Sequence, residues 1–364
     1  MNKIRRMLVA KKTETNGGSS MSIDKRKALI GVMIVAAGLS TPLMAEKMVE
    51  EIVVTASKRD SKLQDIAGAA NVIGGDLITA SDVQTVRDMT VAVPNLSIGD
   101  QFGFARVFIR GIGMTSIDIG GEGSVAFLQD GAIVPRPAAQ LMGMFDLSQI
   151  EVLRGPQGTL YGRGATAGAI NLVTKKPGDV LGGYLSTTVG NFGLQSVEGA
   201  IDVPMSDQLG MRFAAKNVQR DGYGSNLFSG DEVDDQDAQS YRLTFAYDSG
   251  ANLKGSLSMQ YYEEDDKNYA FHYFGPSAGS SGTLPLAVPI LGGKTVSQVG
   301  GDIYDINSDQ EAINTRDGQM LNLNLSYDIS DSLSVTSTTS KQKMDRFLRD
   351  DLDSTDANLF GQNN

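Results

Sequence analysis

The chain has 364 residues, a formal net charge of −11, no cysteine and a single histidine, His272. Without cysteine it has neither disulfides nor cysteine-ligated metal centres. The net negative charge argues against binding to a nucleic acid backbone, which requires clustered Lys and Arg.

The amino-terminal region has the pattern of an export signal. Residues 28–45 carry no charge, follow a basic triplet at 25–27 and are interrupted by Pro42. A basic stretch, an apolar stretch and a small residue before the cleavage point define a signal peptide. We therefore predict a signal peptide over residues 1–45, with Met21 as an alternative start. The alternative interpretation is a membrane anchor, which requires about 20 apolar residues.

A short extended segment follows this signal. Its centre, Ile52 to Thr55, is β-branched, and its flanks from Glu50 to Arg59 are charged. β-Branched residues favour extended backbone, and such a segment near a chain terminus can add a strand to the sheet edge of a partner. The alternative is that it forms the first strand of the folded domain.

The next region mixes the periods of helices and strands. Residues 76–89 carry apolar side chains at helical spacing, with Ser81-Asp82 as a cap before a second helix. Short apolar runs between glycine-rich turns predict strands at 105–109, 125–128, 150–153 and 169–174. This order of elements predicts a small α+β domain.

Three motifs in this domain are rich in glycine, which permits positive φ and close backbone approach. They are Ile109 to Gly113, the turn dipeptide Asp130-Gly131 and the stretch from Ile150 to Thr174. The glycine spacing matches neither G-x-G-x-x-G nor the phosphate-binding loop, so nucleotide binding is not predicted. Candidates for buried ion pairs that hold the domain in place are Arg110, Arg154 and Arg163 with Glu151.

Beyond residue 180 the apolar period changes to two. The apolar positions are Tyr241, Leu243, Phe245 and Tyr247, then Leu253, Leu257, Met259 and Tyr261, then Leu321, Leu323, Leu325 and Tyr327. Segments of about ten residues with one apolar face are typical of transmembrane β-barrels, although a soluble β-sandwich alternates in the same way. We predict seven strands, at 181–190, 194–203, 209–218, 240–248, 252–262, 319–328 and 332–343.

The connections between these strands differ in length. Both long ones, 219–239 and 263–318, fall at the same end of the predicted sheet, which is the pattern of extracellular barrel loops. The first is acidic, which favours a solvated loop over a calcium site. Aromatic residues near the second predict an interfacial girdle, with ligand contact as the alternative: Tyr261, Tyr262, Tyr269, Phe271, Tyr273 and Phe274. His272 alone is a weak metal ligand, so no metal site is predicted.

Together these motifs resemble the TonB-dependent outer-membrane transporters. EEIVVTASKRD is similar to the TonB box, and IRGIG, Asp130-Gly131 and IEVLRGPQGTLYGRGATAGAINLVTKKP are similar to the plug domain of that family. The implied fold is an α+β plug domain followed by part of an antiparallel transmembrane β-barrel. The implied divisions are a signal peptide (1–45), a TonB box and linker (46–61), a plug domain (62–177) and barrel strands (178–364).

The resemblance assigns site residues by their match to the family motifs. The TonB box comprises Glu51, Ile52, Val53, Val54, Thr55 and Ala56. The plug motif comprises Arg110, Gly111, Asp130, Gly131, Glu151, Arg154, Gly155, Gly158, Tyr161, Gly162, Gly164 and Gly168. Ligand-facing positions are expected at the plug apices, at Phe102, Phe104, Arg136 and Gln140, with packing against the barrel wall as the alternative.

The resemblance also implies a function. It predicts an outer-membrane receptor and transporter of a Gram-negative bacterium, not an enzyme, that takes up a scarce nutrient by energy-coupled displacement of its plug. A ferric siderophore complex is the commonest cargo of the family, and the sequence does not identify the cargo of this chain. The implied partners are the periplasmic domain of TonB with its inner-membrane energising complex, outer-membrane lipid and lipopolysaccharide, and a small-molecule ligand, but no nucleic acid. No cofactor is expected, and iron enters only within a transported chelate.

The number of predicted strands is small for this family. Barrels of this type have about 22 strands, and seven strands lead us to expect the amino-terminal part of a longer protein. The alternative function is that of an exported β-rich structural or adhesion protein. An exported hydrolase is disfavoured, because an H-E-x-x-H motif is absent from the sequence.

Overall fold

A computed structural model describes residues 53–56, 58, 61–62, 64, 68–81, 83–114, 121, 123–267, 270, 272, 293–351, 355–356 and 361–363. By internal contacts the chain divides into residues 1–49 and 50–364, and every described residue belongs to the second unit. The predicted signal peptide therefore lies outside the described residues. Among the described residues, no helix has both the length and the apolar character needed to cross a membrane.

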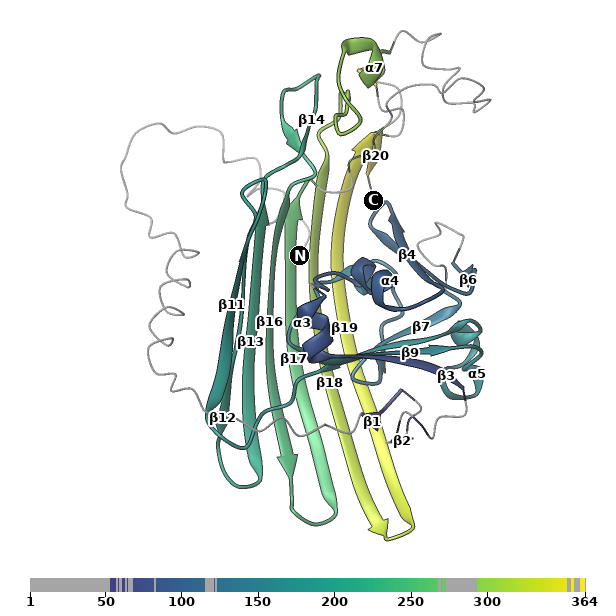
Figure 1. The fold of residues 1–364 in the computed structure, drawn as a ribbon, viewed down its shortest axis with the longest axis vertical. Coiled ribbons are helices and arrows are strands. Elements are labelled where there is room, and N and C mark those ends of the chain that lie inside the picture. The colour runs from purple at the N-terminus through teal and green to yellow at the C-terminus, as the bar shows by residue number, and fades with distance from the viewer. Residues whose placement is uncertain are drawn as a thin grey trace, which may run out of the picture. The chain divides into compact units, whose positions relative to one another are not determined.

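The larger sheet, here called the wall, has eight antiparallel strands (Figure 1). Each long strand pairs with its sequence neighbours through hairpins, as the period-two pattern predicts. The strands are β11 (Gly182–Val189), β12 (Gln195–Pro204), β13 (Leu209–Arg220), β16 (Gln236–Asp248), β17 (Leu253–Asp266), β18 (Ile313–Ser330), β19 (Leu333–Asp351) and β20 (Gly361–Asn363).

The seven predicted strands are all present, but two details of the prediction were wrong. The later strands are longer than about ten residues, because polar residues continue the pairing beyond the apolar run, and β19 has 19 residues. An eighth strand, β20, pairs with the end of β19 and lies beyond the last predicted strand. It has only three residues, too few for a period to be recognised.

The two faces of the wall differ in polarity as predicted. Leu257 pairs with Leu323, and Met259 pairs with Leu321, so apolar side chains adjoin across strands on one face. On the opposite face, Arg242 and Gln260 lie opposite each other on β16 and β17 and are buried. Because side chains alternate along a strand, the other polar residues of these strands also lie mainly on this second face.

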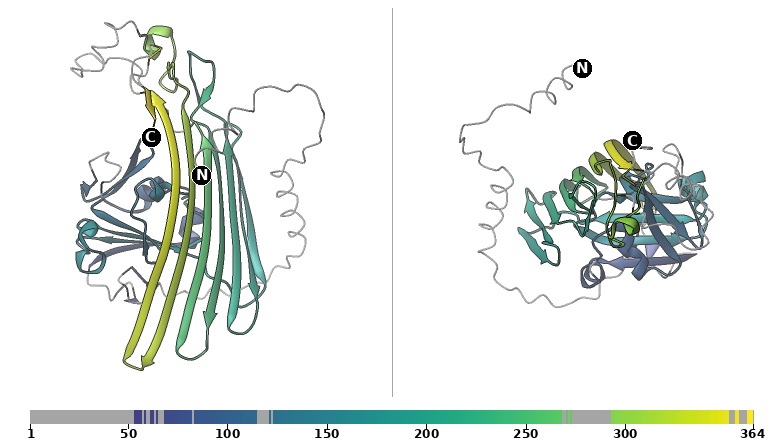
Figure 2. Two further views of the ribbon diagram at one scale, coloured as in Figure 1. Left: turned by 180° about the vertical axis from the view of Figure 1, so that it is seen from behind. Right: turned by 90° about the horizontal axis from the view of Figure 1, so that it is seen from above.

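The connections at the two ends of the wall also differ. Turns of a few residues join β12 to β13, β16 to β17 and β18 to β19 at one end. At the other end, two long connections follow β13 and β17 (Figure 2, left). The first was predicted as a plain loop but contains a small hairpin, and the second contains a helix: β14 (Gly224–Ser225), β15 (Glu232–Val233) and α7 (Val296–Val299).

The plug domain is built on a mixed five-stranded sheet with the order β3-β9-β10-β7-β8. β10 pairs parallel with β7 and antiparallel with β9. A separate three-stranded sheet has the order β4-β5-β6. The strands are β3 (Ala69–Gly74), β4 (Leu96–Gln101), β5 (Phe104–Ile109), β6 (Ile112–Gly113), β7 (Val125–Gln129), β8 (Ala132–Ile133), β9 (Leu147–Arg154) and β10 (Gly168–Thr174).

The predicted helical region is interrupted. It consists of α3 (Gly75–Ala80), a 3₁₀ turn η3 (Val86–Asp88) and α4 (Met89–Ala92). The expected cap at Ser81-Asp82 was wrong. The element that follows α3 is η3, which is capped by Thr85, and Thr85 forms a capping box with Asp88. Shorter helical turns lie at η4 (Ala139–Leu141), α5 (Gly158–Tyr161) and η5 (Arg163–Ala165).

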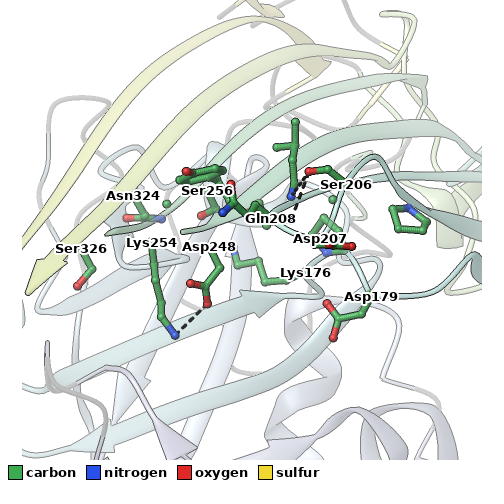
Figure 3. A pocket seen from close by; sticks show the side chains of 18 of the residues that line it. Lys176, Asp179, Ser206, Asp207, Gln208, Asp248, Lys254, Ser256, Asn324 and Ser326 are labelled. Atoms are coloured by element: carbon green, nitrogen blue, oxygen red, sulfur yellow. Dashed lines mark hydrogen bonds and ion pairs between the residues drawn. The ribbon is translucent and has the colours of Figure 1, made fainter. Parts of the chain in front are cut away.

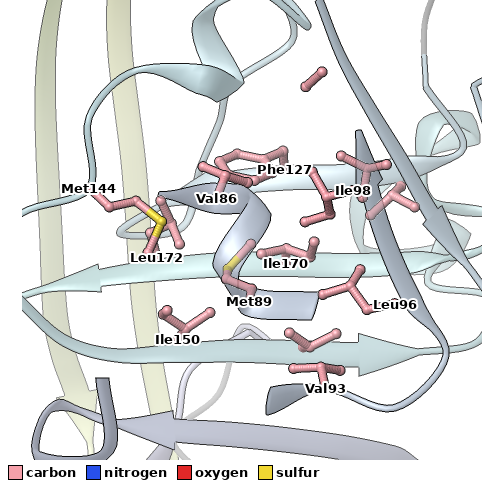
Figure 4. Packing of buried hydrophobic residues seen from close by; sticks show 14 of the residues in the cluster. Val86, Met89, Val93, Leu96, Ile98, Phe127, Met144, Ile150, Ile170 and Leu172 are labelled. Carbon is pink, nitrogen blue, oxygen red and sulfur yellow. The ribbon is translucent and has the colours of Figure 1, made fainter. Parts of the chain in front are cut away.

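An apolar core holds these elements together (Figure 4). Met89 from α4 packs in one cluster with Ile150 and Ile170 from the central strands, and all three side chains are fully buried. Burying one such side chain contributes about 1.5–3 kcal/mol. The short helices are therefore stabilised by packing on the sheet rather than by their own length.

Candidate functional site: the contacts of the plug domain

Glu151, at the centre of β9, binds the segment that resembles the TonB box. Its carboxylate accepts hydrogen bonds from the backbone N–H groups of Thr55 (2.8 Å) and Ala56 (2.7 Å). The Thr55 hydroxyl donates to the same carboxylate at 3.1 Å. Glu151 is fully buried, and a buried charge is tolerated when it is hydrogen-bonded in this way. One carboxylate therefore fixes two consecutive peptide groups of the segment.

Further contacts surround this carboxylate. Asn171 and Gln149 donate their side-chain amides to it at 3.0 and 2.7 Å. The Tyr161 hydroxyl donates to the Ala56 carbonyl at 2.5 Å. Burial, followed by the nearby Glu151 charge, raises the pKa of Tyr161 to about 12, so this hydroxyl keeps its proton at neutral pH.

The segment itself is partly buried against the plug domain. Val54 and Ala56 belong to an apolar cluster that includes Leu153, Tyr161 and Ala169. Two short strands, β1 (Val53–Val54) and β2 (Ser61–Lys62), also pair here. Of the predicted TonB box, Glu51 and Ile52 lie outside the described residues. The assignment of the box as a TonB-binding element stays a prediction.

Asp146, just before β9, joins the plug domain to the wall. Its two carboxylate oxygens accept from Arg212 on β13 at 2.6 and 2.9 Å. Arg212 also donates to Asp202 on β12 at 2.6 Å. Both Asp146 and Arg212 are buried. Bidentate Arg–carboxylate pairs are among the stronger and more directional contacts in proteins.

Arg242 on β16 makes the second contact of this region. Its guanidinium donates to the Phe145 carbonyl at 3.3 Å and lies 4.2 Å from the centroid of the Phe145 ring. It also donates to Gln260 on β17 at 3.0 Å. The turn before β9 is therefore held by basic side chains from two neighbouring wall strands.

The ion pairs that were predicted for the plug domain are not the contacts that hold the domain against the wall. Arg110 and Arg163 are exposed, and Arg154 donates to the Pro94 carbonyl at 3.4 Å. Glu151 faces the amino-terminal segment instead. Sequence reasoning missed Asp146, Arg212 and Arg242. A signal for the two arginines was present in the sequence. Arg212 and Arg242 alternate with apolar residues along their strands, so they lie on the face opposite the apolar one, and a charge at such a position in a membrane protein needs a partner.

The predicted turns are present, and one of them meets the wall. Arg110-Gly111 joins β5 to β6, and Asp130-Gly131 joins β7 to β8, in both cases with positive φ at both residues. Positive φ at two consecutive residues is typical of a type I′ hairpin turn and favours glycine at the second. Asn322 and Asn324 on β18 donate to the carbonyls of Gln129 and Asp130 at 3.3 and 3.2 Å.

The remaining plug motif glycines lie around the connection from β9 to β10. α5 begins at Gly158, and η5 contains Gly164. Gly155 lies before α5, Gly162 lies between the two turns, and Gly168 begins β10. A Cβ atom on Gly168 would lie 2.3 Å from the backbone oxygen of Leu153 on the paired strand. Only glycine allows these two strands to approach so closely at this point.

The four predicted ligand-facing residues lie in different environments. The Phe102 carbonyl accepts from Arg346 of β19 at 2.5 Å, and the same guanidinium lies 4.7 Å from the centroid of the Phe104 ring. These are contacts with the wall, as the alternative interpretation expected. Gln140 is buried and donates to the Val134 carbonyl at 3.0 Å, whereas Arg136 is exposed. A ligand role for these residues stays a prediction.

A hollow of about 400 Å³ lies at the end of the wall that carries the short turns (Figure 3). It is lined by residues 176–179, by the turn after β12 and by the facing ends of β16 to β18. Lys254 and Asp248 form an exposed ion pair of 3.0 Å at its margin. None of the four predicted ligand residues lines it. Within the described part of the chain, no group of three or more His, Cys, Asp or Glu side chains is arranged to hold a metal ion.

The geometry is that of a small α+β domain held on the polar face of a wall of long antiparallel strands, with an extended segment attached to it. Residues 62–169 match the family model of the TonB-dependent receptor plug domain. The chain is 31% identical over 161 residues to the pesticin receptor of Yersinia pestis, a match that covers 41% of this chain and 23% of the relative. It is 26% identical over 289 residues to a probable TonB-dependent siderophore receptor, PiuA, of Acinetobacter baumannii, covering 78% of this chain and 35% of the relative.

Solved structures share the fold. The crystal structure of the ferric yersiniabactin uptake receptor FyuA from Yersinia pestis superposes with a TM-score of 0.65 at 17% identity, covering 78% of this chain and 42% of that one. The siderophore receptor PiuA from Acinetobacter baumannii superposes with a TM-score of 0.63 at 18% identity, covering 83% and 40%. The chain thus spans about a third or less of the length of the curated relatives named above.

Residues 62–169 thus match the plug domain of the TonB-dependent receptors, and the wall strands resemble part of the barrel of the solved receptors. The matched relatives are TonB-dependent receptors of Gram-negative bacteria, in agreement with the predicted resemblance. The family consists of receptors and transporters, which are not enzymes.

Proposed function

We propose that this chain takes part in TonB-dependent uptake of a ferric siderophore complex across the outer membrane. The plug domain would be displaced by energy that the periplasmic domain of TonB and its inner-membrane complex supply. The chain itself is not an enzyme and needs no resident cofactor, and iron enters only as part of the cargo. Outer-membrane lipid and lipopolysaccharide surround the wall.

One observation carries this proposal: an extended segment that resembles the TonB box is attached directly to the plug domain. The Thr55 and Ala56 N–H groups bind Glu151 on a central plug strand, so a partner that removes this segment acts on the domain itself. A partner strand that pairs with the segment uses the N–H groups of alternate residues and therefore needs one of these two. Binding of TonB and the contact with Glu151 therefore compete.

A pull-down with purified TonB periplasmic domain tests the coupling. We expect the chain in detergent micelles to retain that domain, and deletion of residues 51–56 to abolish retention. A variant with Leu77→Ala, an exposed position on α3, is the matched control, because it leaves the segment intact. Retention that survives the deletion would remove the TonB-box assignment.

The cargo class rests on the relatives. Those matched include a siderophore receptor of Acinetobacter baumannii and a vitamin B12 transporter, BtuB, of Vibrio vulnificus, the latter 28% identical over 149 residues. The solved structures named above are siderophore receptors. Growth on single ferric siderophores as the iron source, in a strain whose gene has been deleted and then restored, tests this class. Normal siderophore use with impaired use of cobalamin would contradict it.

The alternative function is an exported structural or adhesion protein. Such a protein would fold in water without detergent and would be indifferent to deletion of residues 51–56. The apolar face of the wall, which exposes Leu321, Leu325 and Val335, favours the membrane protein, because large apolar surfaces are costly in water.

A further inference from the structure

The single histidine of the chain lies between the two long connections of the wall. His272 belongs to the connection from β17 to β18, and its Nε2 atom lies 2.6 Å from a carboxylate oxygen of Asp234. Asp234 belongs to the other connection, from β13 to β16. The Nδ1 atom of His272 lies 3.3 Å from the backbone oxygen of Asp305. The imidazole thus contacts the other connection through Asp234 and a later part of its own connection through Asp305.

Both partners of the imidazole are hydrogen-bond acceptors. A backbone carbonyl can only accept, and an ionised carboxylate can only accept. A neutral imidazole has one N–H group and can donate to one of them, whereas the protonated imidazolium donates to both. Only the protonated form therefore satisfies both contacts that the geometry provides.

The charges around His272 also favour its protonated form. The hydrogen bond to Asp234 is the main cause that raises the pKa of His272 above its ordinary value, while burial opposes it and the charges of Asp234 and Asp350 add to it. The Asp305 carboxylate is engaged by the N–H groups of Ser225 and Asp302. Of the other charged or titratable groups on these segments, Arg220 donates to the Asp234 carbonyl and Tyr223 lies near the Asp234 charge. The same segments also carry Asp231, Glu232, Asp235, Lys267, Asp302, Tyr304 and Asp309.

We propose that His272 is a proton-operated clasp between the two outer connections. When protonated it ties Asp234 and the Asp305 backbone together, and when it loses its proton at least one of these bonds opens. Because the folded pKa is raised, this contribution is fully present below the ordinary pKa of histidine, about 6.5, and is lost as pH rises through the higher folded value. The clasp does not depend on the identity of the cargo or on TonB.

Some contacts between the same connections involve no titratable group. The Asn226 side-chain amide donates to the Ser308 carbonyl at 2.9 Å, and its oxygen accepts from the Ser308 N–H at 3.1 Å. The Leu227 N–H donates to the Ile306 carbonyl at 2.8 Å. Loss of the proton should therefore loosen the contact near Asp234 while the Asn226 contact persists. This pair of contacts provides a matched control.

The first test reads the protonation state directly. NMR of the full chain in detergent, labelled with ¹⁵N-histidine, shows the signals of a single imidazole, since His272 is the only histidine. We expect both nitrogens to remain protonated above the ordinary pKa and the Asp234→Asn variant, which keeps the shape but not the charge, to titrate at lower pH. A neutral imidazole at about pH 6, or an unchanged pKa in the variant, would overturn the proposal.

The second test reads the clasp itself by amide hydrogen exchange. The N–H groups of Asp234 and Ile306 donate to carbonyls across these segments. After correction for intrinsic rates, we expect the protection at Asp234 to fall as pH rises, by about tenfold for each unit by which the folded pKa exceeds the ordinary one.

Two variants complete this second test. In His272→Gln the protection at Asp234 should be low and independent of pH, because glutamine carries no titrating proton. In Asn226→Ala the protection at Ile306 should fall equally at every pH. Equal pH dependence at Asp234 in the wild type and in His272→Gln, or no pH dependence in either, would show that the histidine does not hold these segments.

Discussion

Two buried carboxylates carry the contacts of the plug domain, Glu151 toward the amino-terminal segment and Asp146 toward the wall. Each is bound by several donors; Glu151 lies at the centre of β9, and Asp146 lies just before its first residue. The plug motif of the sequence contained Glu151, but nothing in the motif indicated that backbone N–H groups would be its partners. Asp146 could not be recognised from sequence, because its partners are distant in the chain.

Replacement of Glu151 by glutamine should free the amino-terminal segment. Each carboxylate oxygen of Glu151 now accepts one of the two backbone N–H groups. In glutamine an N–H₂ group replaces one of these oxygens, so a donor faces a donor and one of the two contacts becomes repulsive. The chain has no cysteine, so Lys58→Cys carries a unique spin label, and its mobility should increase in the Glu151→Gln variant. Gln149→Ala removes a donor to the same carboxylate but leaves both backbone contacts, and it should leave the label immobile. Equal mobility in all three proteins would contradict the role of Glu151.

Replacement of Asp146 by asparagine should destabilise the contact with the wall. The buried Arg212 then loses its bidentate partner, and breaking a buried ion pair from one side costs about 3–5 kcal/mol. Denaturant unfolding in detergent measures this loss. Asp202→Asn removes the other, less buried partner of Arg212 and should cost less. A larger loss for Asp202→Asn would mean that Asp146 is not the main anchor.

At the level of elements, the strands were the most predictable part of the chain. Alternating polarity located β11, β12, β13, β16, β17, β18 and β19, because one face of each is apolar and the other polar. The small strands β14, β15 and β20 have two or three residues, too few to show a period. The helices were less predictable, since α3 and α4 are single turns stabilised by packing rather than by sequence propensity.

Gly168 offers a test at the start of β10. Alanine there would place Cβ 2.3 Å from the Leu153 backbone oxygen, so the β9–β10 pairing must shift. We expect Gly168→Ala to lower the free energy of unfolding by about 1–3 kcal/mol, the cost typical of forced backbone strain. At Gly164 the nearest atom to an added Cβ is 3.5 Å away, so Gly164→Ala should have little effect. Thermal unfolding of both variants decides between these outcomes.

At the level of the whole molecule, the wall has an apolar face and a face that receives the plug domain. The sequence predicted the two faces but not which plug residues meet the wall. That information depends on the register of distant segments, such as Asn324 with Asp130. The cargo is likewise not encoded in any local pattern.

A charge on the apolar face tests its exposure to lipid. Leu323, near the middle of β18, pairs with Leu257 on that face. Arginine near the bilayer midplane costs about 2–4 kcal/mol in outer-membrane barrels, so Leu323→Arg should reduce folding stability in lipid vesicles by that amount. Ser326→Arg lies on the opposite face beside the hollow and should be tolerated. Equal tolerance of both would favour the alternative of a soluble β-rich protein.

The order of strands in the plug sheet has a mechanical consequence. β3 is an edge strand that pairs on one side only, with β9, whereas β9 pairs on both sides and is anchored beside its first residue by Asp146. β3 is also the strand nearest in sequence to the amino-terminal segment. A pulling force on that segment would therefore load an edge strand first. Once the segment has left Glu151, the sheet would yield by peeling away β3 while Asp146 keeps β9 attached to the wall, so a path could open without expelling the whole domain.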